Sequence, residues 1–151
     1  MSDTTYNNYF GACKMSYFKK ACRISTADDW FSKYIRLRDA DDNGVCQCCT
    51  CWVSFSWRDM TCGHFQKRHH AGTRFNDQNC AAQCVSCNSF RDGEQYKHGK
   101  YINLKYGEGT ADKLQALAWA HGVVHKHDDK TLAAFYRAKA KAIAKQKGLV
   151  I

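Results

Sequence analysis

The first regular pattern along the chain is a stripe of apolar residues at helical spacing. In the stretch STADDWFSKYIRLRDADDNG, apolar positions recur every three or four residues, as in a helix with one face toward a core. They are Trp30, Phe31, Tyr34, Ile35 and Leu37. Thr26 and Asp29 have the spacing of a capping pair, and DDNG is a strong turn signal. The pattern predicts a helix that begins near Thr26 and ends before DDNG.

After this turn, the apolar residues recur at every second position instead of every third or fourth. Apolar residues alternate with serines in VSFSW, residues 53–57, so we expect a half-buried strand within a β-hairpin between residues 46 and 65. Residues 66–78, QKRHHAGTRFNDQ, are predicted to form a basic loop. From Asn79 onward, the spacing of the polar residues and cysteines predicts a short helix.

The last third of the chain is predicted to be helical. One helix follows RDGEQ, a second runs from Thr110 to Gly122, and a third spans DDKTLAAFYRAKAKAIAKQKG. The third combines many lysines with an apolar stripe made of Leu132, Phe135, Tyr136 and Ile143. The order of elements predicts an α+β fold that is mostly α-helical by content.

The length and charge of the chain narrow its class. With 151 residues it has the size of one domain, and its formal net charge of +9 favours a polyanionic partner, because clustered Lys and Arg bind phosphates by releasing counterions. The opening MSDTTYNNYFGACKMSYFKK has no apolar signal region, and no apolar run reaches membrane-spanning length. We therefore expect a cytoplasmic protein without a membrane partner.

The cysteines indicate a metal site. Ten cysteines without a secretory signal favour metal ligation or buried thiols over disulfides. Cys84 and Cys87 form a CxxC knuckle, and a second knuckle lies in CQCCTC. The spacing leaves two choices for that second pair, Cys46/Cys49 or Cys48/Cys51. We predict a structural Zn²⁺ held by four thiolates, which leaves no open position for catalysis; buried free thiols and a redox pair are the alternatives.

A histidine lies between the two knuckles. Hydrolysis of a phosphodiester needs a base near neutral pH, which imidazole supplies, and a divalent cation that stabilises charge on the leaving oxygen. His64 is followed by Asn79 at the end of the basic loop and by Asn88 in the predicted short helix. This order of hairpin, histidine, loop, asparagine and helix is the layout of the HNH, or ββα-metal, nucleases.

Several motifs together resemble the phage lambda NinG family, also called the Rap recombination endonucleases. The resemblance covers roughly residues 28 to 145. The motifs that carry it are YIRLRD, CCTC, WRDM followed by CGHF, TRFNDQN, QCVSCN and YINLKYG. It implies a ββα-metal, HNH-like core braced by zinc, with flanking helices. It also matches Cys48/Cys51 better than Cys46/Cys49 as the first zinc pair.

The resemblance implies a role for each polar residue of the motif. His64 would be the general base that activates water, Asn79 would orient the loop or the imidazole, and Asn88 would help to hold Mg²⁺ or Mn²⁺. The chain has Thr61 where the family often has an acidic residue, and Ala81 where it often has a histidine. We expect Asp59 to replace the missing carboxylate, because residues two apart on a strand share a face.

The resemblance also implies a substrate. We expect a structure-selective endonuclease for branched recombination intermediates, Holliday junctions and D-loops, and a C₂ homodimer would place one catalytic site on each of two strands. The loop residues expected to contact DNA phosphates are Lys67, Arg68, His69 and Arg74. A non-catalytic zinc-ribbon DNA-binding protein, a general HNH nicking nuclease and a thiol-redox protein are the alternatives.

These predictions divide the single domain, 1–151, into three segments. Residues 1–45 form an N-terminal helical arm, residues 46–92 form the zinc-braced nuclease core, and residues 93–151 form the C-terminal helices.

Overall fold

The computed structural model describes residues 24–120 and 128–151. The rest of the predicted N-terminal arm, and the predicted helix end at Gly122, lie outside the described residues. In chain order the elements are α2 (Thr26–Asp39), β1 (Val45–Gln47), β2 (Ser54–Ser56), β3 (Thr61–His64), the 3₁₀ turn η1 (Asp77–Asn79), β4 (Cys80–Gln83), the π-helical turn η2 (Ser86–Phe90), α3 (Gln95–Tyr106), α4 (Thr110–Trp119) and α5 (Asp129–Gln146). The predicted α+β class with a predominance of helix is confirmed.

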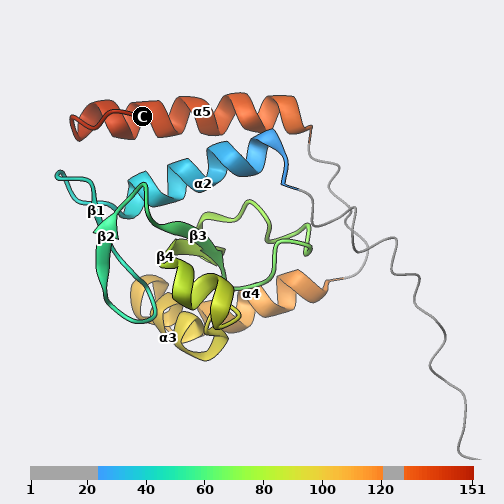
Figure 1. Ribbon diagram of the computed structural model, residues 1–151. Helices are drawn as coiled ribbons and strands as arrows, with labels where there is room; N and C mark the ends of the chain where they lie inside the picture. Colours follow the sequence, from blue (N-terminus) through green and yellow to red (C-terminus); the bar gives the residue numbers. More distant parts are fainter. Residues whose placement is uncertain (1–23, 121–127) are drawn as a thin grey trace, which may run out of the picture.

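Helix α2 confirms the first predicted helix, with its cap shifted by one residue. Ser25 is the N-cap: its hydroxyl accepts from the backbone N–H of Asp28, and the Asp28 carboxylate accepts from the Ser25 N–H. The predicted capping pair of Thr26 and Asp29 is therefore wrong. The N-cap is Ser25, and the third helical residue after it is Asp28. Phe31, Tyr34, Ile35 and Leu37 of the apolar stripe are buried, Trp30 is partly buried, and α5 packs alongside the helix (Figure 1).

The first hairpin is shorter and more exposed than its alternation predicts. Strand β1 pairs antiparallel with β2, which confirms the hairpin, but Val53 and Phe55 are 50% and 45% exposed. Trp57 alone among the three apolar residues of VSFSW is buried, and it lies in the turn after the strand. Within the described part of the chain β2 pairs only with β1, so its side chains stay at the surface.

A second hairpin replaces the helix predicted from Asn79. Residues 80–83 form β4, antiparallel to β3, with Thr61 opposite Gln83 and His64 opposite Cys80. All four residues of β4 are buried, so ladder hydrogen bonds and packing override the helical preference of its two alanines. The close pairing depends on Gly63, since a Cβ there would lie 2.9 Å from Cβ of Gln83. The short helical turn η2 then follows β4, which completes a ββα unit.

Helices lie on two sides of this ββα unit. Helices α2 and α5 lie on one side, and α3 and α4 lie on the other (Figure 1). The larger core joins α2 and α5 to the hairpin through residues such as Phe31, Tyr136 and Cys80. A smaller core, made of Phe65, Ile102, Ala111 and Leu114, joins the start of the 65–79 loop to α3 and α4. The loop is therefore held between two packed layers.

One buried histidine lies in α3 without a polar partner. His98 is fully buried beside the rings of Phe65 and Tyr101, with centroids 6.0 and 6.4 Å away. Neither of its ring nitrogens has a hydrogen-bond partner among the described residues. Burial in this apolar environment lowers the pKa of His98 to about 4, because the charged imidazolium would lose its hydration.

This histidine should make the fold sensitive to acid. The unfolded chain binds a proton at His98 near its ordinary pKa of about 6.5, whereas the folded chain does so only near 4. Its contribution is therefore fully present above about pH 6.5 and is lost as the pH falls toward 4. We expect His98→Leu to reduce the loss of unfolding free energy between pH 7 and pH 5 by about 2 kcal/mol. Urea unfolding at constant Zn²⁺ measures this loss. The His69→Leu variant should change it less, because burial also lowers the pKa of His69 but that side chain is exposed, whereas His98 is fully buried. Equal pH slopes in all three proteins would refute the assignment.

Candidate functional site

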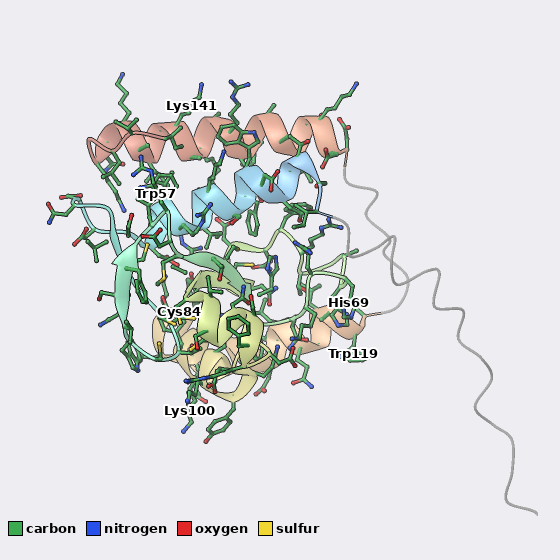
Figure 2. All side chains as sticks on the ribbon, viewed as in Figure 1. Trp57, His69, Cys84, Lys100, Trp119 and Lys141 are labelled. Atoms are coloured by element: carbon green, nitrogen blue, oxygen red, sulfur yellow. The ribbon has the colours of Figure 1, made fainter. Side chains whose placement is uncertain are left out.

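Four cysteine sulfurs converge between the two hairpins. The Sγ atoms of Cys48, Cys51, Cys84 and Cys87 all lie within 4.8 Å of one another, and those of Cys51 and Cys84 are 3.8 Å apart. A tetrahedral zinc with Zn–S bonds of ~2.3 Å separates its sulfurs by roughly 3.8 Å. Backbone N–H groups of Cys84 and Cys87 point at the sulfurs of Cys48 and Cys84, at 3.4 and 3.5 Å. The cluster, in which Figure 2 labels Cys84, is compatible with one structural zinc.

The geometry selects one of the two pairs that the spacing left open. The turn after β1 brings Cys48 and Cys51 together, with the Trp52 N–H bonded to the Cys48 carbonyl at 3.0 Å. Cys46 instead donates its thiol to the carbonyl of Arg36 at 3.1 Å. Cys49 is buried beside β4 and takes no part in the group of four. Burial raises the pKa of Cys84 and Cys87, so their thiolate forms need a cation beside them.

Loss of this cluster should unfold the centre of the protein. We expect Cys84→Ser to lower bound zinc at this cluster and to abolish the cooperative thermal transition, because metal binding at such a site contributes directly to folding. Cys46→Ser is the matched control: it removes a buried thiol outside the cluster and keeps a donor for the Arg36 carbonyl. Zinc content by elemental analysis and circular dichroism are the measurements. Zinc retained by the Cys84→Ser/Cys87→Ser double variant at this cluster would contradict the assignment.

His64 ends strand β3 with a defined tautomer. Its Nε2 lies 3.0 Å from the carbonyl oxygen of Arg74, and a carbonyl can only accept, so Nε2 carries the proton. The lone pair is therefore on Nδ1. Burial lowers the pKa of His64, and the nearby positive charge of Arg68 acts in the same direction. The imidazole is thus neutral at neutral pH and able to accept a proton.

A buried asparagine closes the loop that carries this carbonyl. Asn79 is fully buried; its Oδ1 accepts from the Gln66 N–H at 2.7 Å, and its Nδ2 donates to the carbonyls of Gln66 and Thr73 at 2.9 and 3.1 Å. The two bonds to Gln66 join the ends of the loop, and the third holds its middle at Thr73. Asn79 does not cap a helix, since β4 follows it directly. It positions the loop that orients His64.

The loop is also fastened to α2 by an ion pair. The guanidinium of Arg74 contacts both carboxylate oxygens of Asp28, at 3.0 and 2.5 Å, and both side chains are largely buried. Burial acts to raise the pKa of Asp28, but hydrogen bonds from Arg74 and Ser25 outweigh it, and the pKa lies below its usual value. Arg74, predicted to contact DNA, therefore has a structural partner in this protein.

Two adjoining cavities of about 290 Å³ each open beside His64. Both are lined by Cys62, His64, Arg68 and Asn88. One is bordered by the predicted phosphate-binding residues Lys67 and His69, and the other by Asp28 and Asp29 of α2. Asn88 donates its Nδ2 hydrogen to the Thr61 hydroxyl at 2.9 Å, which fixes its amide beside the cavities. The structure therefore brings His64 and Asn88 together, with basic residues on one side and, on the α2 side, two aspartates beside Arg36.

Asp59 does not join this group. It is exposed in the turn before β3 and lines neither cavity. The expectation that it shares a strand face with residue 61 is wrong, because β3 begins only at Thr61. Asp29 is the exposed carboxylate at the cavity, and the sequence pattern marked it only as a capping residue of α2.

The outer part of the loop rests on α4. Lys67 pairs with Asp92 at 2.5 Å, and the His69 ring lies 4.1 Å from that of His70. His70 in turn donates its Nδ1 hydrogen to the carbonyl of Ala118 at 3.0 Å and packs against Trp119. Figure 2 shows His69 and Trp119 at the same end of the molecule. His70 therefore has a structural contact, whereas the exposed His69 lines the cavity.

The fold and site define a mixed α+β protein in which a zinc-compatible Cys₄ cluster braces a ββα unit. The family model described as Bacteriophage Lambda NinG protein matches residues 13–146, so the chain belongs to the NinG family. No curated protein and no solved structure matches it. No helix within the described residues is long and apolar enough to cross a membrane.

Proposed function

We propose that this NinG-family chain is a metal-dependent endonuclease that cuts branched DNA, such as Holliday junctions and D-loops, during phage recombination in the host cytoplasm. The observation that carries the proposal is the state of His64. Its Nε2–H is bonded to the Arg74 carbonyl, its pKa is lowered, and it faces cavities that Asn88 shares. An imidazole held in this way is a general base, since its Nδ1 can take a proton from water at neutral pH.

The cavity also has ligands suitable for a hard cation. Mg²⁺ and Mn²⁺ bind oxygen atoms and commonly use one or two carboxylates together with substrate phosphates. Asn88 and Asp29 both line the cavity on the α2 side of His64, and we assign them to hold the cation. When bound, the ion would stabilise charge on the leaving oxygen. Asp29 thereby replaces Asp59 as the proposed carboxylate ligand.

The basic side of the site fits the DNA backbone. Lys67, Arg68 and His69 border the cavity beside His64, where they would contact phosphates next to the scissile bond. The exposed lysines of α5, among them Lys141 (Figure 2), add positive charge on another side of the molecule. Backbone contacts of this kind carry no sequence information, which suits an enzyme that recognises branch shape. A C₂ homodimer would supply the two symmetric nicks that resolve a four-way junction.

Substitution of the base tests the activity. We expect His64→Ala to reduce cleavage of a fixed four-way junction by about 10² to 10⁴-fold in Mn²⁺, with DNA affinity and the zinc content of the Cys₄ cluster unchanged, because a general base acts on the barrier. The parent should cut the junction faster than a linear duplex of the same arm sequence, and EDTA should stop both reactions. Equal rates on the two substrates would indicate a general HNH nuclease.

The rival function is a DNA-binding protein without catalysis. It is favoured by Thr61 and the buried Ala81, which provide no carboxylate or imidazole at positions where the family often has one. Junction binding without cleavage by the parent protein, in either Mg²⁺ or Mn²⁺, would establish this rival.

Separate substitutions of Asp29 and Asp59 show which of the two carboxylates holds the catalytic ion. Asp29→Asn should weaken activation by Mn²⁺ and raise the metal concentration needed for half-maximal cleavage about ten-fold or more, since a carboxylate ligand to the ion is lost. Asp59→Asn is the matched control, because it removes the same charge from an exposed turn outside the cavities. Cleavage rates measured across a Mn²⁺ titration provide the comparison. A larger effect at Asp59 than at Asp29 would reverse the assignment.

A further inference from the structure

A second group of metal-binding side chains lies on the β3–β4 hairpin, outside the Cys₄ cluster. Cys62, His64 and Cys80 place their ligand atoms within 4.8 Å of one another. Cys62 and His64 are two residues apart on β3 and share a face, while Cys80 lies opposite His64 on β4. Cys80 is 1% exposed, whereas Cys62 and His64 are partly exposed and line both cavities.

These three ligands suit zinc better than magnesium. Two thiolates and one imidazole form a set that zinc accepts at sites with three protein ligands and one open position. Thiolate sulfur is a poor ligand for Mg²⁺, which requires oxygen. The open side of the group faces the cavities, where water or a phosphate oxygen could complete a tetrahedral site.

The orientation of His64 fits metal binding as well. Zinc-bound histidines usually donate the second ring N–H to a carbonyl or carboxylate, which fixes the tautomer. The Nε2–H of His64 has such a partner in the Arg74 carbonyl, at 3.0 Å. The lone pair on Nδ1 is the one that a cation would bind. The positive charge of zinc would also offset the cost of forming a thiolate at the buried Cys80.

We propose that Cys62, His64 and Cys80 form a second zinc site, and that zinc bound there switches off the nuclease. Binding releases the thiol protons of Cys62 and Cys80 and places the ion on Nδ1 of His64. A ring nitrogen bonded to zinc cannot accept a proton from water, so the base is blocked. The inhibitory part of this inference rests on the proposed function, whereas the metal site itself does not.

A metal titration tests the site without any need for activity. Zinc-free, reduced full-length protein is titrated with Co²⁺, whose absorption reports the number of bound thiolates. The parent should bind two equivalents, the second with about half the thiolate charge-transfer intensity of the first, because two sulfurs replace four. Cys80→Ala should bind one equivalent, whereas Cys46→Ala, a buried cysteine outside both groups, should bind two. If Cys80→Ala folds poorly, Cys62→Ala takes its place and should also bind one equivalent. A single equivalent in the parent overturns the site.

A cleavage assay then tests the switch. With the Cys₄ cluster loaded and Mn²⁺ in excess, a second equivalent of Zn²⁺ should slow junction cleavage by the parent at least about ten-fold, while Cys80→Ala should keep most of its rate. Equal inhibition of the parent, Cys80→Ala and Cys62→Ala by Zn²⁺ overturns the inhibitory role. Absence of cleavage by the parent contradicts the proposed function but leaves the result of the Co²⁺ titration standing.

Discussion

The pairing of β3 with β4 is the constraint on which the rest of the site depends. It is the contact that brings residues about 20 positions apart in the chain into one ββα unit. Gly63 permits it, because Gln83 occupies the space that a side chain would need. Gln83 is itself fully buried and donates to the Thr50 hydroxyl and the Gly93 carbonyl, at 3.2 and 2.9 Å. The hairpin is therefore joined directly to the loop of the first cysteine pair.

Helix α2 holds this hairpin through polar contacts as well as through its apolar face. Arg38 donates to the carbonyls of Asp77 and Cys80, both at 2.8 Å, and Asp39 accepts from the Ala82 N–H at 2.9 Å. These side chains satisfy backbone groups of η1 and β4. At the other end of the helix, Asp28 anchors Arg74. The same helix thus supports both strand β4 and the loop that orients the imidazole.

The two candidate metal sites use the hairpin in different ways. The Cys₄ cluster lies where β4 ends and η2 begins, and four thiolates around one zinc would leave it closed to substrate. The group of Cys62, His64 and Cys80 lies at the other end of the strands and borders the cavities. One ion would then stabilise the fold, and the other would compete with the chemistry that we propose for His64.

The sequence by itself determined the helices α2 to α5, the existence of a first hairpin, the Cys84/Cys87 knuckle and the order of His64, Asn79 and Asn88. These features follow from local periodicity and spacing, which short-range geometry controls. The local helix propensity was misleading at residues 80–83. Two alanines there favour a helix, but the segment forms a strand because it pairs with β3.

Only the tertiary structure decided which cysteines converge and which acids reach the cavity. The spacing within CQCCTC allowed two pairs, and the turn after β1 selected Cys48 and Cys51. Arg74 belonged to a basic loop in the sequence, but Asp28, 46 residues earlier, engages it in the fold. Asp29 and Cys80 approach His64 from α2 and β4 for the same reason. Contacts between distant segments depend on how the two core layers pack, and no local pattern along the chain encodes that packing.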